Sequence, residues 1–293
     1  MGITSTVPAA GRRRGGARRL LRHKSGLVGL VVLLLLIVFS ASIGLFTSTD
    51  PAAISLTSRL KPPMTTAGGA YHLLGTDALG RDVLVRMAYG ARISLVIAFS
   101  AVAISLAIGV LIGLLAGYYG GWLDSLLMRV TDAQLAFPFI LLALTVLAAL
   151  GSGLPQLILV LGIGRWDVFA RVVRGEVRSL MQRQQIEACR ALGVGDWRVM
   201  EKHLLPNVLN TVLVVASFSV AAETLTESAL SFLGLGVDPS IPTWGSMLAE
   251  GRDYMRTGWW LTALPGAAIM VTVLAINSIG DWLRDALDPR QAD

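Results

Sequence analysis

Four long stretches of this sequence contain no charged residue, and they constrain the fold more than any other feature. They cover residues 26–46, 93–123, 133–164 and 258–280, which are 21, 31, 32 and 23 residues long. A helix rises about 1.5 Å per residue, so about 20 apolar residues cross the hydrocarbon core of a membrane. The sequence therefore predicts an all-α integral membrane protein.

Six transmembrane helices are expected. Residues 26–46 and 93–123 supply the first two, and 258–280 the sixth. Gly151 to Pro155 interrupts the third stretch, which predicts a tight turn between spans three and four, with span four extended into Arg165–Val173. The fifth span begins at Asn207. A cleaved signal peptide is the alternative for residues 26–46, but the apolar run exceeds the 7–15 residues of a signal core, which favours an uncleaved anchor.

The basic residues indicate the orientation of these spans. With six spans, 18 Lys and Arg residues fall on the side of the two termini and 7 on the other side. Cytoplasmic loops carry the excess of Lys and Arg, so both termini are expected in the cytosol. The net charge of +6 fits this distribution better than it fits nucleic-acid binding. The domain map is a basic tail (1–25), the first span (26–46), an extracytoplasmic segment (47–91), a five-helix core (92–283) containing a loop at 184–206, and a cytoplasmic tail (284–293).

Glycine recurs at every fourth position in the second uncharged stretch, at Gly109, Gly113 and Gly117. Small residues with this spacing lie on one face of a helix and allow a second helix to approach closely. We therefore expect a close helix–helix contact along this row.

The stretch Glu187–Pro206, EACRALGVGDWRVMEKHLLP, is the longest polar interval in the second half of the chain. It predicts a short helix that ends at Gly193, followed by a second helix, Trp197–Leu205, that Pro206 stops or restarts. Two short helices joined at a glycine between spans form a rigid projection, which suits docking to a partner better than catalysis.

Motifs for chemistry are missing. A phosphate-binding loop needs Gly directly before Lys, and none of the three lysines has that neighbour. The single cysteine, Cys189, excludes an internal disulfide, and the isolated histidines make a zinc site improbable. The aspartates around Arg81 are expected to form a charge-paired, turn-rich surface. We expect no catalytic residue, metal or cofactor on this chain.

Glu223 and Glu227 lie one helical turn apart on the expected fifth span, toward its outer mouth. Ionisable groups at membrane depth are costly and usually face a cavity or a partner. The pair is therefore a candidate for the translocation path or an outer gate. Hydrated carboxylates outside the bilayer are the alternative interpretation.

Five motifs in order resemble the permeases of binding-protein-dependent ABC importers, in particular the second-permease type of the peptide/nickel group. They are HLLGTDALGRDVL (72–84), the 187–206 stretch, ESALSFLGLG (227–236), PTWGSML (242–248) and GDWLRDALDPR (280–290). The family pattern has alanine where this chain has Cys189, and isoleucine where it has His203. The resemblance implies that residues 184–206 form a coupling loop, with Glu187, Ala188, Cys189, Gly193, His203, Leu205 and Pro206 at the ATPase contact.

The resemblance also implies the assembly. A second homologous permease would complete the path, one or two cytosolic ABC ATPase subunits would bind ATP and Mg, and an extracytoplasmic binding protein would deliver solute, all at the bacterial inner membrane and its lipid. Di- or oligopeptides are the expected solutes, with nickel chelates or glutathione-like compounds as alternatives. An ATPase-independent channel or secondary transporter is the second class of function, and an intramembrane enzyme the third.

Overall fold

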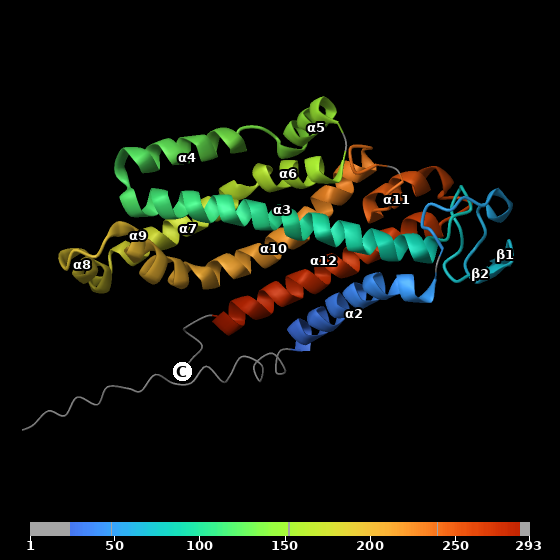
Figure 1. The fold of residues 1–293 in the computed structure, drawn as a ribbon, viewed down its shortest axis with the longest axis horizontal. Helices are drawn as coiled ribbons and strands as arrows, with labels where there is room; N and C mark the ends of the chain where they lie inside the picture. Colours follow the sequence, from blue (N-terminus) through green and yellow to red (C-terminus); the bar gives the residue numbers. More distant parts are fainter. Residues whose placement is uncertain (1–23, 48, 152, 239, 288–293) are drawn as a thin grey trace, which may run out of the picture.

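The computed structural model describes residues 24–47, 49–151, 153–238 and 240–287. The predicted basic tail lies outside these residues except for its last two positions, and so does the end of the predicted C-terminal tail. The molecule is an elongated helical bundle (Figure 1). Two β-strands lie at one end of its long axis, here called the strand end. Helices α8 and α9 lie at the opposite end, here called the loop end.

Helices account for most of the described chain. The long ones are α2 (Lys24–Phe46), α3 (Val83–Tyr119), α10 (Leu205–Phe232) and α12 (Trp260–Leu287). Shorter ones are α4 (Gly121–Leu135), α5 (Phe139–Leu150), α6 (Leu154–Gly164), α7 (Trp166–Met181), α8 (Gln184–Ala191), α9 (Asp196–Val199) and α11 (Trp244–Gly251). Single turns are η1 (Leu56–Ser58), the π-helical η2 (Met200–Leu204) and η3 (Arg252–Tyr254).

One small sheet departs from the all-α expectation. Strands β1 (Thr65–Ala67) and β2 (Ala70–His72) pair antiparallel, with Ala67 opposite Ala70. The two residues between them, Gly68 and Gly69, both have positive φ, which is the backbone that a two-residue hairpin turn requires.

Among the described residues, four helical segments are long and apolar enough to cross a membrane: Lys24–Leu45, Val83–Tyr119, Asp196–Phe232 and Trp260–Leu287. A fifth is possible if α4 and α5, which are bent by 83° at their junction, act as one span. The predicted six spans are not confirmed. Pro138 breaks the third uncharged stretch in addition to the expected turn, so its α5 and α6 are only 12 and 11 residues long.

Helix α3 begins at Val83, about ten residues before the predicted boundary at 91–92. Asp82 starts it, because the Asp82 carboxylate accepts a hydrogen bond from the Val85 amide at 3.1 Å. The helix therefore includes Arg86 and Arg92, which the search for uncharged stretches had excluded. Gly120 and Gly121, both with positive φ, end it.

The glycine row of α3 packs directly against α7, as predicted. A Cβ atom on Gly113 would lie 2.7 Å from the Ala170 carbonyl oxygen, and one on Gly117 would lie 2.8 Å from the Val177 Cβ. Gly109 faces Phe169 in the same way, so the register advances in the same direction along both helices. Helices α3 and α7 therefore run parallel, and α4 packs beside them, tied to α7 by Arg174 and Arg178 on Asp124.

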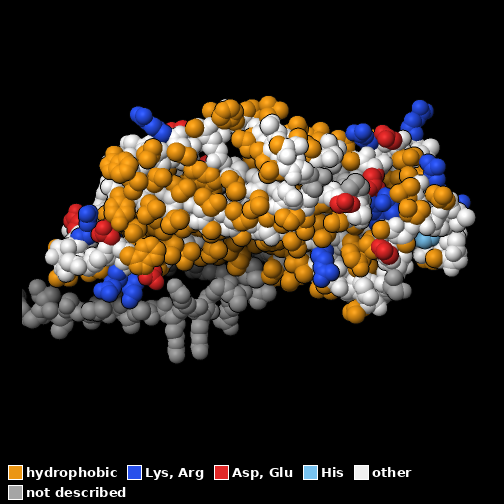
Figure 2. Space-filling model, turned by 45° about the horizontal axis from the view of Figure 1, so that its top comes forward, with side chains coloured by type: hydrophobic (Ala, Val, Ile, Leu, Met, Phe, Trp, Pro, Cys, Tyr) orange, Lys and Arg blue, Asp and Glu red, His pale blue; other side chains and the backbone are white. Residues whose placement is uncertain are grey.

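Helix α2 packs along α12 at the other side of the bundle (Figure 1). Gly26, near the start of α2, lies against Trp282, near the end of α12, and Gly29 lies against Ala275. The two helices are therefore antiparallel, and the two ends of the described chain lie close together. Figure 2 shows hydrophobic side chains over the middle of the molecule, with most charged side chains toward its two ends.

We expect Gly113→Val to destabilise the bundle by about 1–3 kcal/mol, because its added atoms would overlap the α7 backbone in a closely packed contact. Gly175→Val on α7 is the matched control, since a Cβ there meets nothing within 4 Å. Denaturant unfolding of the purified protein in detergent micelles measures both. Equal stability of the two variants would contradict the close contact.

Candidate functional site

The predicted coupling loop, residues 184–206, begins as the sequence indicates. Helix α8 ends at Ala191, and Gly193 follows with φ +73°, a left-handed conformation. The Gly193 amide donates to the Arg190 carbonyl at 3.0 Å, and the Val194 amide donates to the Cys189 carbonyl at 3.1 Å. These bonds satisfy carbonyls at the end of α8, which is the task of a glycine at this position.

In the second half of the loop, Pro206 does not stop the helix, which was one of its two predicted roles. It lies at the start of α10, and α9, η2 and α10 form one helical segment from Asp196 to Phe232. Proline has no amide hydrogen, and its ring clashes with the carbonyl four residues earlier. The wider π-helical turn at Met200–Leu204 lies directly before Pro206 and accommodates this defect. The loop is therefore one short helix plus the start of the span that follows.

The loop is fixed to the bundle from its inner side. Ile186, Val199 and Leu204 are buried in the main core cluster. The Tyr118 hydroxyl at the end of α3 donates to the Asp196 carboxylate at 2.7 Å, and the Arg190 guanidinium lies 5.8 Å from the Tyr118 ring centre. Helices α8 and α9 are thus held against α3 as well as joined to α10.

The seven predicted coupling residues divide into two groups. Four are exposed: Glu187, Ala188, Gly193 and Pro206. Three are half-buried: Cys189, His203 and Leu205. The Cys189 sulfur lies 3.8 Å from His203 Nε2, so its thiol turns toward the helix that follows. Sequence reasoning missed Leu192 and Trp197, whose 83% and 67% exposure adds an apolar surface to the loop.

Glu223 is buried and faces a small cavity, here called the Glu223 cavity. The cavity has a volume of about 280 Å³ between α3, α7 and α10. Arg165, the one residue between α6 and α7, reaches Glu223 with its Nε 3.3 Å from Oε1. The other carboxylate oxygen, Oε2, is buried without a hydrogen-bond partner. Arg165 was missed as a site residue, although its place directly after an uncharged stretch was a usable signal.

Glu227 has a different environment from Glu223. It is fully buried, its Oε1 accepts from the Ser231 hydroxyl at 2.8 Å, and the Ser94 and Thr243 hydroxyls also bond to it. These partners lie on α10, on α3 and at the start of α11, so the carboxylate joins three elements near the strand end. It does not line the Glu223 cavity. Neither carboxylate is hydrated at the surface.

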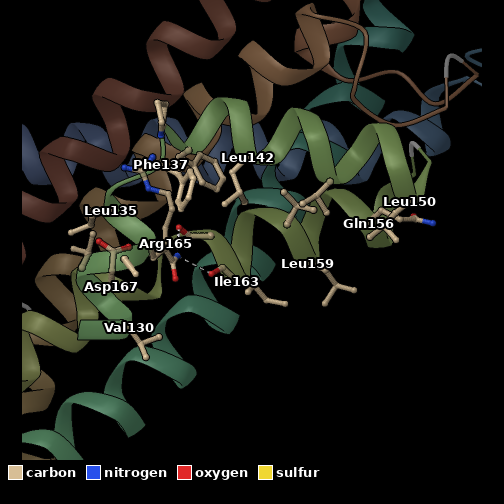
Figure 3. Close-up of a pocket in the computed structure, with 18 residues that line it drawn as sticks. Val130, Leu135, Phe137, Leu142, Leu150, Gln156, Leu159, Ile163, Arg165 and Asp167 are labelled. Carbon is tan, nitrogen blue, oxygen red and sulfur yellow. Dashed lines mark hydrogen bonds between the residues drawn. The ribbon is translucent and has the colours of Figure 1, made fainter. Parts of the chain in front are cut away.

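A second, larger space lies on the side of α4 to α7, and we call it the apolar hollow (Figure 3). Its volume is about 900 Å³, and its walls are mostly aliphatic and aromatic, including Phe137, Leu142 and Ile163. Arg165 borders both this hollow and the Glu223 cavity, and its guanidinium lies 5.8 Å from the Phe139 ring centre.

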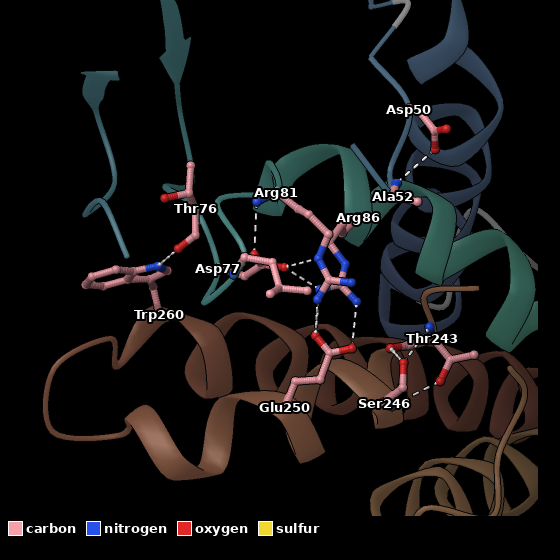
Figure 4. Close-up of polar contacts among 11 residues, drawn as sticks. Asp50, Ala52, Thr76, Asp77, Arg81, Arg86, Thr243, Ser246, Glu250 and Trp260 are labelled. Carbon is pink, nitrogen blue, oxygen red and sulfur yellow. Dashed lines mark hydrogen bonds and ion pairs between the residues drawn. The ribbon is translucent and has the colours of Figure 1, made fainter. Parts of the chain in front are cut away.

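A buried ionic cluster lies at the strand end (Figure 4). Arg86 on α3 binds Asp77 and both carboxylate oxygens of Glu250 on α11, the latter at 2.6 and 3.0 Å. Arg81 binds the same two carboxylates, each at 2.6 Å. The predicted charge pairing around Arg81 is present, but it is a buried tie between the 47–82 segment, α3 and α11 and not a surface.

No group of three or more His, Cys, Asp or Glu side chains that could hold a metal ion occurs among residues 24–287, apart from the three undescribed positions within that range. What the described residues offer is a projecting loop, a long helix that continues from it, and a charged cavity along that helix.

Comparison with known proteins decides the family. A family model described as "Binding-protein-dependent transport system inner membrane component" matches residues 109–293, more than half of the chain. The chain belongs to this family. A second model, the N-terminal transmembrane domain of oligopeptide transport permease C, matches residues 14–63. This protein is therefore a permease subunit of a binding-protein-dependent ABC importer, and it is a membrane protein that has no enzymatic role in that family.

Relatives of this permease cover three quarters or more of its length. A putative peptide transport system permease protein of Brucella abortus is 43% identical over 94% of this chain and 90% of its own. A dipeptide transport system permease protein of Alkalihalophilus pseudofirmus is 40% identical over the same shares. A glutathione transport system permease protein of Escherichia coli is 45% identical over 75% of this chain and 72% of its own.

The fold has a solved counterpart. An inward-facing structure of the MetNI methionine ABC transporter aligns with a TM-score of 0.55 and 21% identity. The alignment covers 68% of this permease and 94% of that chain. At this identity the likeness establishes the fold alone.

Proposed function

We propose that this permease carries short peptides across the inner membrane as one half of a two-permease path. The observation that carries the proposal is the 43% identity, over 94% of the chain, to a relative named as a peptide permease. Nickel chelates and glutathione-like compounds are the competing solutes, and the glutathione permease relative gives the second of these its weight.

The chain would cross the membrane six times, with the 184–206 loop in the cytosol. Helices α6 and α7 are separated only by Arg165 and pack in succession along α3, so together they would form the fourth crossing. The parallel direction of α3 and α7 supports this, because parallel neighbours require a return crossing by α4 and α5. The adjacency of Gly26 and Trp282 supports termini on one side of the membrane.

The energy would come from partner chains. No lysine of this permease lies in a phosphate loop, so ATP and Mg would be bound by one or two ABC ATPase subunits that dock on the exposed face of α8 and on Trp197. An extracytoplasmic binding protein would deliver solute at the strand end. A second permease would close the path.

Reconstitution tests this function. Proteoliposomes are prepared with both permeases and with the ATPase subunits on the luminal side. They should accumulate dialanine only when ATP is in the lumen and the binding protein is outside. Accumulation by permeases without ATPase subunits would favour the alternative of a channel or secondary transporter.

The proposed topology makes a separate prediction. A reporter that is active only in the cytosol should give a signal at the C-terminus and none within residues 47–70. The basic-residue bias and the position of β1 and β2, at the end opposite α8, motivate this expectation. A cytosolic signal from 47–70 in a folded, transporting fusion would overturn the orientation.

A further inference from the structure

The Glu223 cavity carries an inference about the solute. Its walls are largely apolar, and Glu223 and Arg165 are the charged side chains that line it. Two hydroxyls join them, Ser105 and Ser219, and the apolar walls are Val102, Val168, Phe169, Val215, Phe218 and Ala222. The Ser105 hydroxyl already donates to the Gly162 carbonyl at 2.7 Å. The cavity thus presents one anionic and one cationic group within an apolar wall.

Glu223 is not satisfied by this chain. Its Oε1 has a single contact to Arg165 at 3.3 Å, which is longer than the 2.7–2.9 Å usual for a hydrogen bond between charged groups. Its Oε2 has no partner although the side chain is only 2% exposed. A buried carboxylate oxygen without a hydrogen-bond donor is costly. A ligand in the cavity that donates a hydrogen bond to Oε2 would remove this cost.

Arg165 is similarly underused. Besides Glu223 and the Phe139 ring, its guanidinium has one long hydrogen bond, 3.4 Å to the Thr226 hydroxyl, although it carries five N–H donors. The side chain is 37% exposed and also borders the apolar hollow, so a ligand in either space can reach it.

We propose that Glu223 and Arg165 form a binding site for zwitterionic short peptides, with Glu223 accepting from the free α-amino group and Arg165 donating to the α-carboxylate. Without a peptide, the two side chains form a long ion pair with each other. The proposal rests on the peptide-permease function and names the solute class of the path. The volume of about 280 Å³ lies at the small end of ligand pockets, which suits a dipeptide better than a long peptide.

The charges also separate the competing solutes. A site with one carboxylate and one guanidinium is electrically balanced by a zwitterion. Glutathione carries an additional carboxylate, which would lie near Glu223 without a cation of its own. Blocking either end of a peptide should therefore weaken binding, because one buried charge of the site would stay unpaired.

Direct binding tests the site without ATP or binding protein. The full transporter is held in lipid nanodiscs, and radiolabelled dialanine is titrated in the millimolar range. We expect saturable binding that unlabelled dialanine displaces and that N-acetyl-dialanine and glutathione displace at least about 10-fold more weakly. Glu223→Gln should weaken dialanine binding by at least about 10-fold, and so should Arg165→Gln.

Arg171→Gln is the matched control for Arg165→Gln. Arg171 lies on α7 six positions after Arg165, outside the cavity, in an exposed ion pair with Asp132. The variant should leave dialanine binding unchanged. Equal binding by wild type and Glu223→Gln, equal displacement by N-acetyl-dialanine, or no saturable binding to wild type would each overturn the site. If binding follows these expectations but ATP drives no uptake, the site stands and the importer function fails.

Discussion

Replacing Gly193 with valine is expected to abolish solute-stimulated ATP hydrolysis and uptake while leaving the chain in the membrane. Gly193 has φ +73°, a conformation in which a β-branched residue is strained by about 1–3 kcal/mol. Its added atoms would meet nothing within 4 Å, so the effect comes from the backbone and not from crowding inside the chain. The turn would reopen and displace the exposed residues Leu192 and Trp197. Uptake and ATP hydrolysis by the reconstituted transporter measure the loss.

Two further variants separate the effect of backbone strain from the effect of the larger side chain. Gly193→Asn should retain most activity, since asparagine tolerates left-handed backbone. Gly195→Val adds the same bulk two residues away, at φ −62°, where the added Cβ also meets nothing, and should remain coupled. Normal uptake by Gly193→Val would refute a coupling role for the turn. Loss of uptake in Gly195→Val would instead make the surface fit decisive.

Cysteine crosslinking is a further test of this loop, and the structure indicates which position to use. Cys189 is half-buried against His203, so its thiol is poorly placed to reach a partner. The neighbouring Ala188 is exposed and therefore better placed. The crosslinking variant is Ala188→Cys/Cys189→Ser. A disulfide from position 188 to an ATPase groove would support the docking surface.

Replacing Arg86 with methionine is expected to cost about 3–5 kcal/mol of stability. Methionine has a similar size but carries no charge, so Arg81 would be the only cation left beside Asp77 and Glu250. The Arg86 side chain is only 2% exposed, so water replaces it poorly. Removing one member of a buried ionic cluster leaves an uncompensated charge. Denaturant titration of the purified protein in detergent micelles measures the free energy of unfolding.

The control and the rescue follow from the same geometry. Arg252→Met removes an exposed arginine whose ion pair, to Asp253, is 3.5 Å long, and should cost less than about 1 kcal/mol. Arg86→Met/Glu250→Gln restores charge balance around Arg81 and should be more stable than Arg86→Met alone. If Arg86→Met lowers the free energy of unfolding by less than about 1 kcal/mol, water must solvate the carboxylates of Asp77 and Glu250 in place of Arg86.

Local patterns in the sequence predicted the features that depend on nearby residues. The uncharged stretch at 26–46 forms most of α2, and the row from Gly109 to Gly117 contacts α7. Gly193 forms the turn that follows the end of α8. Each depends on hydropathy, helical spacing or backbone freedom within a few residues. The family resemblance added the assembly, which no local pattern contains.

What sequence reasoning missed depends on contacts between distant segments. Arg86 lies 164 positions from Glu250, and Arg165 lies 58 from Glu223, so neither pairing has a spacing that could reveal it. Excluding charged residues from spans also placed the start of α3 too late, because a membrane helix can carry arginines where buried carboxylates neutralise them. Glu223 and Glu227 are alike in the sequence, but their surroundings differ, because the partner of Glu223 is the distant Arg165 whereas Glu227 accepts from Ser231 on its own helix.

The π-helical turn before Pro206 keeps the segment from Trp197 to Glu223 unbroken, over 26 residues or about 39 Å. One continuous helix thus links the exposed loop end to the Glu223 cavity. A tilt of about 5° with its loop end held in place would move Glu223 sideways by about 3 Å. That displacement is comparable to the 3.3 Å between Glu223 Oε1 and Arg165 Nε, so a small tilt would lengthen this ion pair.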